Sequence, residues 1–478
     1  MATQTEQARY EHAIEHLNRA IELKVDFVAA YIRRGNFHRN MDKFDLAIED
    51  YNTAIRLTGS PAEAYYNRGV AYGMKGEVDK AIDDFTQAIQ YEPDYAEAYY
   101  QRGNAYFIKD EFDLAIEDCD KVVQLNPDAA DAYLVRGNAY SSKDEVDRAI
   151  ADYSKAIRLK PDFADAYVVR GNAYGSKGEL DLAIADYTQA LELKPNYVDA
   201  YIVRSHIHVL KRDFDAAIAD CEKMIELRPN AADPYVTRAT AYSLKNDFDA
   251  AITDCEIAIE HNPSAADAYL ILGMAFSSKG EIDSALVNYT KAIKLHPNYL
   301  NAYYERGSAY SSRGEFDKAI TDYTKVIRLN PHHIGCYFDR GIAYSEKGDF
   351  DKAVTDYTTV LKLRPDHIPA YVNRGNIYGT KGESDLAIAD YTMAMQLNPL
   401  LEISYYNRGN VYDFEKQIGV KLPDDIAAML MQQEEKTRTQ SVKENLLGPS
   451  SEVDRRSFEE IAEMRAQQAR SNPNPIHI

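Results

Sequence analysis

Asparagines recur along this chain at multiples of 34 residues, and their side chains could bind an extended peptide. A side-chain amide offers hydrogen-bond donors and an acceptor, so it can pair with a peptide backbone whatever the peptide's sequence. The alternative is that asparagine is only a polar residue tolerated at this position. Other residues interrupt the series in its middle. The asparagines are Asn36, Asn104, Asn138, Asn172, Asn376 and Asn410.

A second row with the same period is apolar and aromatic. If its side chains are exposed, they form a strip that anchors side chains of a ligand. If they are buried, they belong to the core, and the sequence leaves both readings open. The row comprises Tyr66, Tyr100, Leu134, Val168, Ile202, Val236, Leu270, Tyr304, Phe338, Val372 and Tyr406. We take Tyr66, Tyr100, Tyr304 and Phe338 as its candidate binding residues.

A third row is acidic and could attract lysine or arginine side chains of a ligand. Its other interpretation is complementation of a helix dipole only. The row comprises Glu63, Glu97, Asp131, Asp165, Asp199, Asp233 and Asp267, with Asp131, Asp165 and Asp199 as candidate binding residues.

Motifs for other chemistry are missing from the sequence. It contains no glycine-rich phosphate loop, nucleophile motif or paired-acid constellation, and its four cysteines have no metal-ligand spacing. We therefore expect a protein that is not an enzyme and that uses no cofactor or metal. The net charge of −21 argues against nucleic-acid binding, which needs a basic stripe.

The hydropathy pattern argues against a membrane location. No segment approaches the 18 consecutive apolar residues of a spanning helix, and the polar first ten residues lack the apolar stretch of a signal peptide. We expect a cytoplasmic protein.

The elements that must position these rows follow from a strict 34-residue period. Arginine stands in eleven copies immediately before a position that is usually glycine, as in Arg136-Gly137, and Ser205 and Ala239 replace the glycine in two of these copies. Each copy contains two stretches with apolar residues at helical spacing, which predicts a helical hairpin. Glycine, aspartate or asparagine lies between the stretches, with Arg212 as the exception, and we expect a left-handed residue there. A proline closes most copies.

The pattern Tyr-x2-Arg-Gly-x2-Tyr, followed by Ala-x3-Tyr/Phe, Ala and Pro, resembles the tetratricopeptide repeat family. The resemblance implies an all-α, right-handed superhelical solenoid whose first helices line a concave inner face. Ladders of groove-facing asparagine are known in similar superhelices. One family subtype grips terminal carboxylates with Lys, Asn and Arg, and no such clamp is visible here.

The resemblance covers eleven whole repeats over residues 28–401. We expect a lone capping helix within residues 1–27, near residues 5–22. Residues 402–478 then hold a degenerate twelfth repeat, C-terminal helices and a flexible tail. A helix near 401–413 is expected first, with others near 423–435 and 451–470.

Three structural expectations follow from the repeats. The arginine pairs with an aspartate sixteen residues later in the same hairpin, because the one repeat that has Leu272 in place of arginine also has Asn288 in place of aspartate. The glycine marks a close helix crossing. An aspartate at the start of each second helix, such as Asp113, caps free N–H groups and meets the helix dipole.

These expectations predict a non-enzymatic scaffold that binds partner proteins or extended peptides, including ones with basic residues, along the concave groove. One alternative is a self-assembling module that forms homo-oligomers through its terminal helices, because the lone helix leaves one face half covered. Another is the repeat module of a larger multi-component enzyme.

Overall fold

The computed structural model describes residues 4–398, 404, 407–408 and 410–411. All regular secondary structure in these residues is α-helical. Contacts divide the chain into two units, with the boundary between Ile207 and His208, inside α12 (Val198–Leu210).

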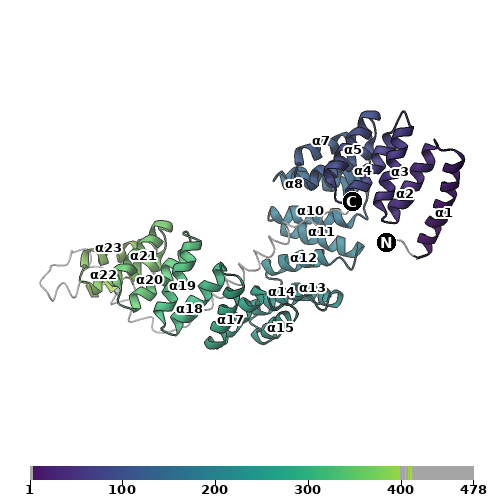
Figure 1. Ribbon diagram of the computed structural model, residues 1–478. Coiled ribbons are helices and arrows are strands. Elements are labelled where there is room, and N and C mark those ends of the chain that lie inside the picture. The colour runs from purple at the N-terminus through teal and green to yellow at the C-terminus, as the bar shows by residue number, and fades with distance from the viewer. Residues whose placement is uncertain (1–3, 399–403, 405–406, 409, 412–478) are drawn as a thin grey trace. The chain divides into compact units, whose positions relative to one another are not determined.

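The first unit contains a single helix followed by five helical hairpins (Figure 1). Its helices are α1 (Gln4–Leu23), α2 (Val28–Asn40), α3 (Phe44–Leu57), α4 (Ala62–Met74), α5 (Val78–Tyr91), α6 (Ala96–Ile108), α7 (Phe112–Leu125), α8 (Ala130–Ser142), α9 (Val146–Leu159), α10 (Ala164–Ser176) and α11 (Leu180–Leu193). Helix α1 agrees with the lone helix predicted near residues 5–22.

The second unit contains α13 (Phe214–Leu227) and five further hairpins. These are formed by α14 (Ala232–Leu244), α15 (Phe248–His261), α16 (Ala266–Ser278), α17 (Ile282–Leu295), α18 (Leu300–Ser312), α19 (Phe316–Leu329), α20 (Ile334–Glu346), α21 (Phe350–Leu363), α22 (Ile368–Thr380) and α23 (Ser384–Leu397).

Within each unit the hairpins stack in sequence order. The first helix of a hairpin packs on its own second helix, on the preceding second helix and on the first helices beside it. The even-numbered helices α2–α10 and α14–α22 therefore each form a continuous layer. This arrangement confirms the predicted repeat architecture, an all-α solenoid of helical hairpins.

Left-handed residues end the first helices, as the sequence predicts. The backbone φ angle lies between 57° and 80° at all eleven positions, including Arg212 at 62°. The residues are Asp42, Gly76, Asp110, Asp144, Gly178, Arg212, Asn246, Gly280, Gly314, Gly348 and Gly382.

An aromatic ring of the second helix explains the recurring glycine of the first. A Cβ atom on Gly137 would lie 2.6 Å from Cε1 of Tyr153, which is 2% exposed. At Gly103 the aromatic residue is replaced by Cys119, and the nearest atom would be 3.3 Å away. The sequence places its two glycine replacements, Ser205 and Ala239, in repeats with Cys221 and Cys255 at that position. The glycine is therefore required by the aromatic ring of the second helix and not, as predicted, by the closeness of the helix crossing itself.

The predicted arginine–aspartate pairs are present as bidentate ion pairs inside the hairpins. Arg136 Nε and Nη2 donate to the two carboxylate oxygens of Asp152, each at 2.7 Å. The pairs are Arg34–Asp50, Arg68–Asp84, Arg102–Asp118, Arg136–Asp152, Arg170–Asp186, Arg238–Asp254, Arg306–Asp322, Arg340–Asp356 and Arg374–Asp390. Where Leu272 replaces arginine, Asn288 donates to the Ser284 carbonyl instead.

The same arginines also bond to the helix that precedes their hairpin, a contact that the sequence reasoning missed. The third guanidinium nitrogen, Nη1, donates to a side chain sixteen residues earlier: Arg306 reaches Thr290 at 3.1 Å, and Arg34 reaches Asn18 of α1 at 2.6 Å. One guanidinium therefore joins two successive structural modules.

The aspartates at the start of the second helices do not cap them, so that expectation was wrong. Each lies at the second helical position, where it still complements the helix dipole. In nine of these aspartates the carboxylate pairs with a lysine or arginine at the end of the next first helix; Asp45 Oδ1 and Lys75 Nζ are 2.6 Å apart. Side-chain caps occur two residues earlier, at Asp213 and Asp247.

The expected twelfth repeat is described only at isolated helical residues. Ser404 and Arg408 are buried there, and Arg408 Nη1 donates to Thr392 at 3.3 Å. The helices expected near 423–435 and 451–470 lie outside the described residues.

Candidate functional site

The predicted asparagine row lies on the layer of first helices, and its members differ in exposure. Asn104 and Asn138 are buried, at 8% and 7% exposure, whereas Asn36 and Asn172 are partly exposed. Asn376 and Asn410 are exposed.

Four of these amides bond to the second helix of their own hairpin. The oxygen of Asn138 accepts a hydrogen bond from the Tyr153 hydroxyl at 2.9 Å. The same bond joins Asn36 to Tyr51, Asn172 to Tyr187 and Asn376 to Tyr391, at 2.7–2.8 Å. It fixes the orientation of each amide and leaves the two N–H donors to serve a ligand.

The sequence reflects this internal role only in part, because Met274 and Ile342 occupy the asparagine position opposite Tyr289 and Tyr357. In the repeat where Phe85 replaces tyrosine, and no hydroxyl needs an acceptor, Val70 occupies the asparagine position. Asn104 lies opposite Cys119 instead. Burial raises the pKa of Tyr100, and the neighbouring Asn104 amide opposes the shift. At least four members of the predicted binding row thus have a structural role.

The apolar row is buried at four positions in the middle of the chain, and its other described members, including Ile202, are partly exposed. Leu134, Val168, Val236 and Leu270 are buried, at 6% exposure or less. The partly exposed members include Tyr66, Tyr100, Tyr304, Phe338 and Val372, and Tyr406 lies outside the described residues.

Three partly exposed aromatic residues of this row, Tyr66, Tyr304 and Phe338, pack against rings from the turns between hairpins. The ring centroids of Tyr66 and Tyr95 are 5.1 Å apart, and those of Phe338 and His367 are 4.9 Å apart. These contacts hold the aromatic side chains in place with part of their surface open to solvent.

The acidic row is exposed at Glu63, Glu97, Asp131, Asp165 and Asp233, and partly buried at Asp199 and Asp267. Some members bond to tyrosines of the following turn. The Tyr299 hydroxyl donates to Asp267 at 2.6 Å. Burial, followed by its hydrogen bond to Asp165, raises the pKa of Tyr197. Asp131 is the candidate that stays most available for a cation.

Carboxylates immediately before the arginine form a site feature that the sequence reasoning missed. Glu305 is 3% exposed, and the Tyr304 hydroxyl donates to Asp339 at 2.8 Å. Burial raises the pKa of Asp339 to about 6, although the Tyr304 hydrogen bond opposes the shift. The signal was available, because equivalent positions such as Val135 and Val169 are apolar.

Comparison with known families assigns this architecture. Four family models, described as Tetratricopeptide repeat or TPR repeat, match residues 62–95, 96–129, 164–197 and 300–333; 35–76, 137–178, 273–312 and 341–382; 205–275; and 368–399. Together these segments cover well over half of the chain. The chain belongs to the tetratricopeptide repeat family.

Solved structures similar to this tetratricopeptide repeat protein include YrrB, described as a TPR protein with an unusual peptide-binding site. It is 23% identical over 40% of this chain and 97% of its own, with a TM-score of 0.37. MamA is 35% identical over 34% and 94%, with a TM-score of 0.32. Yeast Tom70 is 18% identical over 85% and 99%, with a TM-score of 0.42. No curated protein matches the chain.

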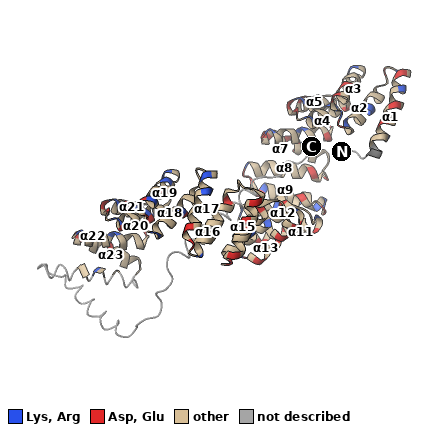
Figure 2. Cartoon of the chain, turned by 60° about the horizontal axis from the view of Figure 1, so that its bottom comes forward, with Lys and Arg blue, Asp and Glu red and all other residues tan. Residues whose placement is uncertain are grey.

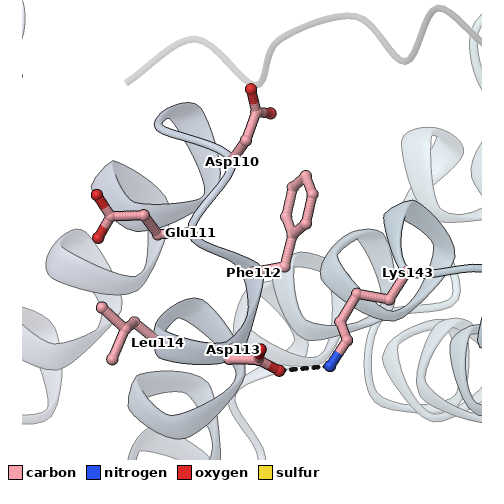
Figure 3. A pocket seen from close by; sticks show the side chains of 6 residues that line it. All are labelled: Asp110, Glu111, Phe112, Asp113, Leu114 and Lys143. Atoms are coloured by element: carbon pink, nitrogen blue, oxygen red, sulfur yellow. Dashed lines mark hydrogen bonds and ion pairs between the residues drawn. The ribbon is translucent and has the colours of Figure 1, made fainter.

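An open depression of about 450 Å³ lies away from the predicted site residues of this tetratricopeptide repeat protein (Figure 3). An ion pair between Asp113 and Lys143 closes one side of it. Its lining residues are Asp110, Glu111, Phe112, Asp113, Leu114 and Lys143. The lining offers no nucleophile with an adjacent base, so we assign it no catalytic role.

Among the described residues, no helix is long and apolar enough to cross a membrane. The same residues hold no cluster of three or more metal-ligating side chains.

Proposed function

We propose that this protein is a non-enzymatic scaffold that binds extended peptide segments or partner proteins along its layer of first helices. Membership in the tetratricopeptide repeat family makes the chain a protein-interaction repeat module. The finer assignment to a peptide-binding groove rests on the asparagine row, together with the aromatic and acidic rows beside it.

The observation that carries the proposal is the orientation of the asparagine amides. In Asn138 and Asn172 a tyrosine hydroxyl holds the side-chain oxygen, at 2.9 and 2.7 Å. The N–H donors are thereby preorganised, which lowers the entropy lost on binding a peptide carbonyl. Partly exposed Tyr66 and Tyr100, and exposed Asp131, supply apolar and acidic contacts in the same unit.

The experiment is affinity capture of partners with full-length protein, followed by mass spectrometry. Replacing Asn104, Asn138 and Asn172 together by alanine should remove the partners that the wild-type protein recovers. Unchanged recovery of every partner contradicts the proposal.

A matched control separates binding from stability. The Tyr153→Phe and Tyr187→Phe substitutions remove the internal hydrogen bonds of Asn138 and Asn172 while keeping both amides. Because the amides remain but lose this preorganisation, we expect the variant to capture the same partners more weakly than wild type and better than the alanine variant. A loss as complete as that of the alanine variant would show that the asparagines act through the hairpin structure.

The acidic row suggests ligands with basic residues. Replacing Asp131 and Asp165 by asparagine should weaken capture of such partners, and should do so more at low salt than at high salt. If the variant and the wild-type protein capture these partners equally at both salt concentrations, the carboxylates only complement the helix dipoles.

Self-association through the terminal helix is a second candidate function. Leu23 and Val25, at the end of α1, are 74% and 70% exposed. Replacing both by serine should abolish this mode of association in light scattering across a dilution series. A cytoplasmic location and membership in a larger enzyme complex stay predictions from the sequence.

A further inference from the structure

A charge pattern on the second helices points to a surface outside the proposed peptide groove. In three successive second helices, α11, α13 and α15, the next-to-last residue is glutamate. In the following three, α17, α19 and α21, it is lysine or arginine. These residues are Glu192, Glu226, Glu260, Lys294, Arg328 and Lys362. Among these six residues the sign of the charge reverses once, between Glu260 and Lys294, and Arg158 at the same position of α9 is basic.

Five of these residues belong to the second unit. Lys362, on α21, extends the basic side, and the four that flank the sign reversal two on each side lie on α13, α15, α17 and α19. All four side chains are exposed, and their acidic and basic helices can be followed in Figure 2. Because equivalent helices of stacked repeats occupy equivalent places, the four form one strip across consecutive hairpins. We call Glu226, Glu260, Lys294 and Arg328 the charge strip.

Neighbouring charges strengthen the centre of the strip. Glu256 precedes Glu260 by one turn on α15, and Lys291 precedes Lys294 by one turn on α17; both are exposed. The Lys291 ammonium lies 4.7 Å from the centroid of the Tyr269 ring, a contact that helps to hold the lysine side chain in place. On α13 the acidic charge is weaker, because Lys223 pairs with Glu226 at 2.8 Å.

Apolar side chains accompany the charges. The residue that follows each of three strip members is an exposed leucine: Leu227 is 41% exposed, Leu295 39% and Leu329 37%. An interface along the strip would therefore bury apolar area as well as pair charges, which ion pairs on a surface need in order to contribute affinity.

We propose that the charge strip is a self-complementary interface that binds a second copy of this chain about a two-fold axis. A two-fold axis between α15 and α17 reverses the order of the helices, so Glu260 of one copy faces Lys294 of the other, and Glu226 faces Arg328. Each contact then occurs twice. No uniform row of one charge has this property, and the single sign reversal therefore selects a second copy over a partner of one charge.

The proposal is independent of the peptide groove. The asparagine row lies on the first helices, whereas the strip lies on the second helices. Variants of one surface leave the other intact, so failure of either proposal is distinguishable from failure of the other.

Sedimentation equilibrium of the full-length protein tests the interface. We expect a concentration-dependent dimer at about 0.02 M salt that weakens markedly at about 0.5 M, because exposed ion pairs are screened. Replacing Glu226 and Glu260 by lysine makes the strip uniformly basic. Replacing Lys294 and Arg328 by glutamate makes it uniformly acidic. Each variant should dimerise at least about tenfold more weakly than wild type.

Two recombinations make the test specific. A mixture of the basic and acidic variants should form heterodimers, and the variant with all four substitutions should regain self-association, because its strip is again antisymmetric. A control with Arg56→Glu and Arg158→Glu changes the net charge by the same amount at the same helical position of α3 and α9, and should dimerise like wild type.

Three results overturn the proposal. The first is a wild-type monomer at all concentrations in low salt. The second is dimerisation of both charge-reversed variants with wild-type affinity. The third is failure of both the mixture and the fourfold variant to recover association. If instead the Leu23→Ser and Val25→Ser substitutions abolish the dimer and the strip variants leave it intact, association belongs to the terminal helix.

Discussion

Arg306 and Asp322 form a bidentate ion pair across one hairpin, with both nitrogen–oxygen distances at 2.8 Å. The side chain of Asp322 is only 4% exposed and that of Arg306 16%. A carboxylate this deeply buried depends on its cationic partner, since an unpaired buried charge is strongly unfavourable. The preceding hairpin has Leu272 and Asn288 at the same two positions and needs neither charge.

The Arg306→Leu substitution should destabilise the second unit by about 3 kcal/mol, because it leaves the Asp322 carboxylate unpaired. Adding Asp322→Asn should recover most of that loss, since the double variant reproduces the natural Leu272–Asn288 combination. Chemical denaturation followed by circular dichroism measures both changes. A double variant no more stable than the single one would show that the pair is not energetically coupled.

Alanine should be tolerated at Gly103 and rejected at Gly137. A Cβ atom at Gly137 meets the Tyr153 ring at 2.6 Å, whereas at Gly103 its nearest neighbour is 3.3 Å away. We expect Gly137→Ala to cost about 1–3 kcal/mol by overpacking. Gly103→Ala should be neutral or stabilising by up to about 1 kcal/mol, because alanine favours helix. Thermal melts of the two variants compare them directly, and equal losses would refute the role of the ring.

Asp339 should make stability fall as pH rises from about 4 to about 6. Its pKa is about 6 in the folded protein and about 3.9 in an unfolded chain. Between these two pH values the carboxyl of Asp339 keeps its proton only in the folded state. Its contribution to the free energy of unfolding is therefore complete below about pH 4 and lost above about pH 6.

The Asp339→Asn variant should therefore be more stable than wild type at pH 7 by about 1–2 kcal/mol, and similar to it at pH 4. The amide oxygen can still accept the Tyr304 hydrogen bond. Denaturation at the two pH values gives the difference. Asp366→Asn, whose side chain is 77% exposed, is the control and should show no such trend.

The left-handed turn at Gly178 should discriminate among replacements. Its φ angle is 77°, where a side chain with Cβ costs about 1–2 kcal/mol. Gly178→Ala should lose about that much. Gly178→Asn should lose less, because asparagine tolerates this conformation and the chain itself uses Asn246 there at 63°. Equal melting temperatures for the two variants would contradict this explanation.

The sequence predicts the hairpins, their left-handed turns and the arginine–aspartate pairs because each depends on residue types that recur with one period. It does not reveal the second bond of the arginine, such as Arg306 to Thr290, since the acceptor varies among threonine, serine, asparagine and aspartate. Such variation hides a contact that requires only an oxygen atom.

The candidate site is harder to predict from the sequence because the residues proposed to bind a ligand also pack the first helices. Asn138 satisfies the Tyr153 hydroxyl, and Leu134 in the aromatic row is buried core. Burial depends on neighbours that lie a whole repeat away, so local spacing alone did not separate core from surface. Asp339 was missed because its burial arises from packing between hairpins.

The repeat arginine bonds to side chains sixteen residues later and sixteen residues earlier, which constrains how the chain can change length. Inserting or deleting one amino acid in the loop before or after its helix alters one of these two spacings. Duplicating or removing a complete 34-residue segment regenerates both. The molecule can therefore be lengthened or shortened by whole segments, and designed versions with one segment more or fewer should retain every cross-module bond.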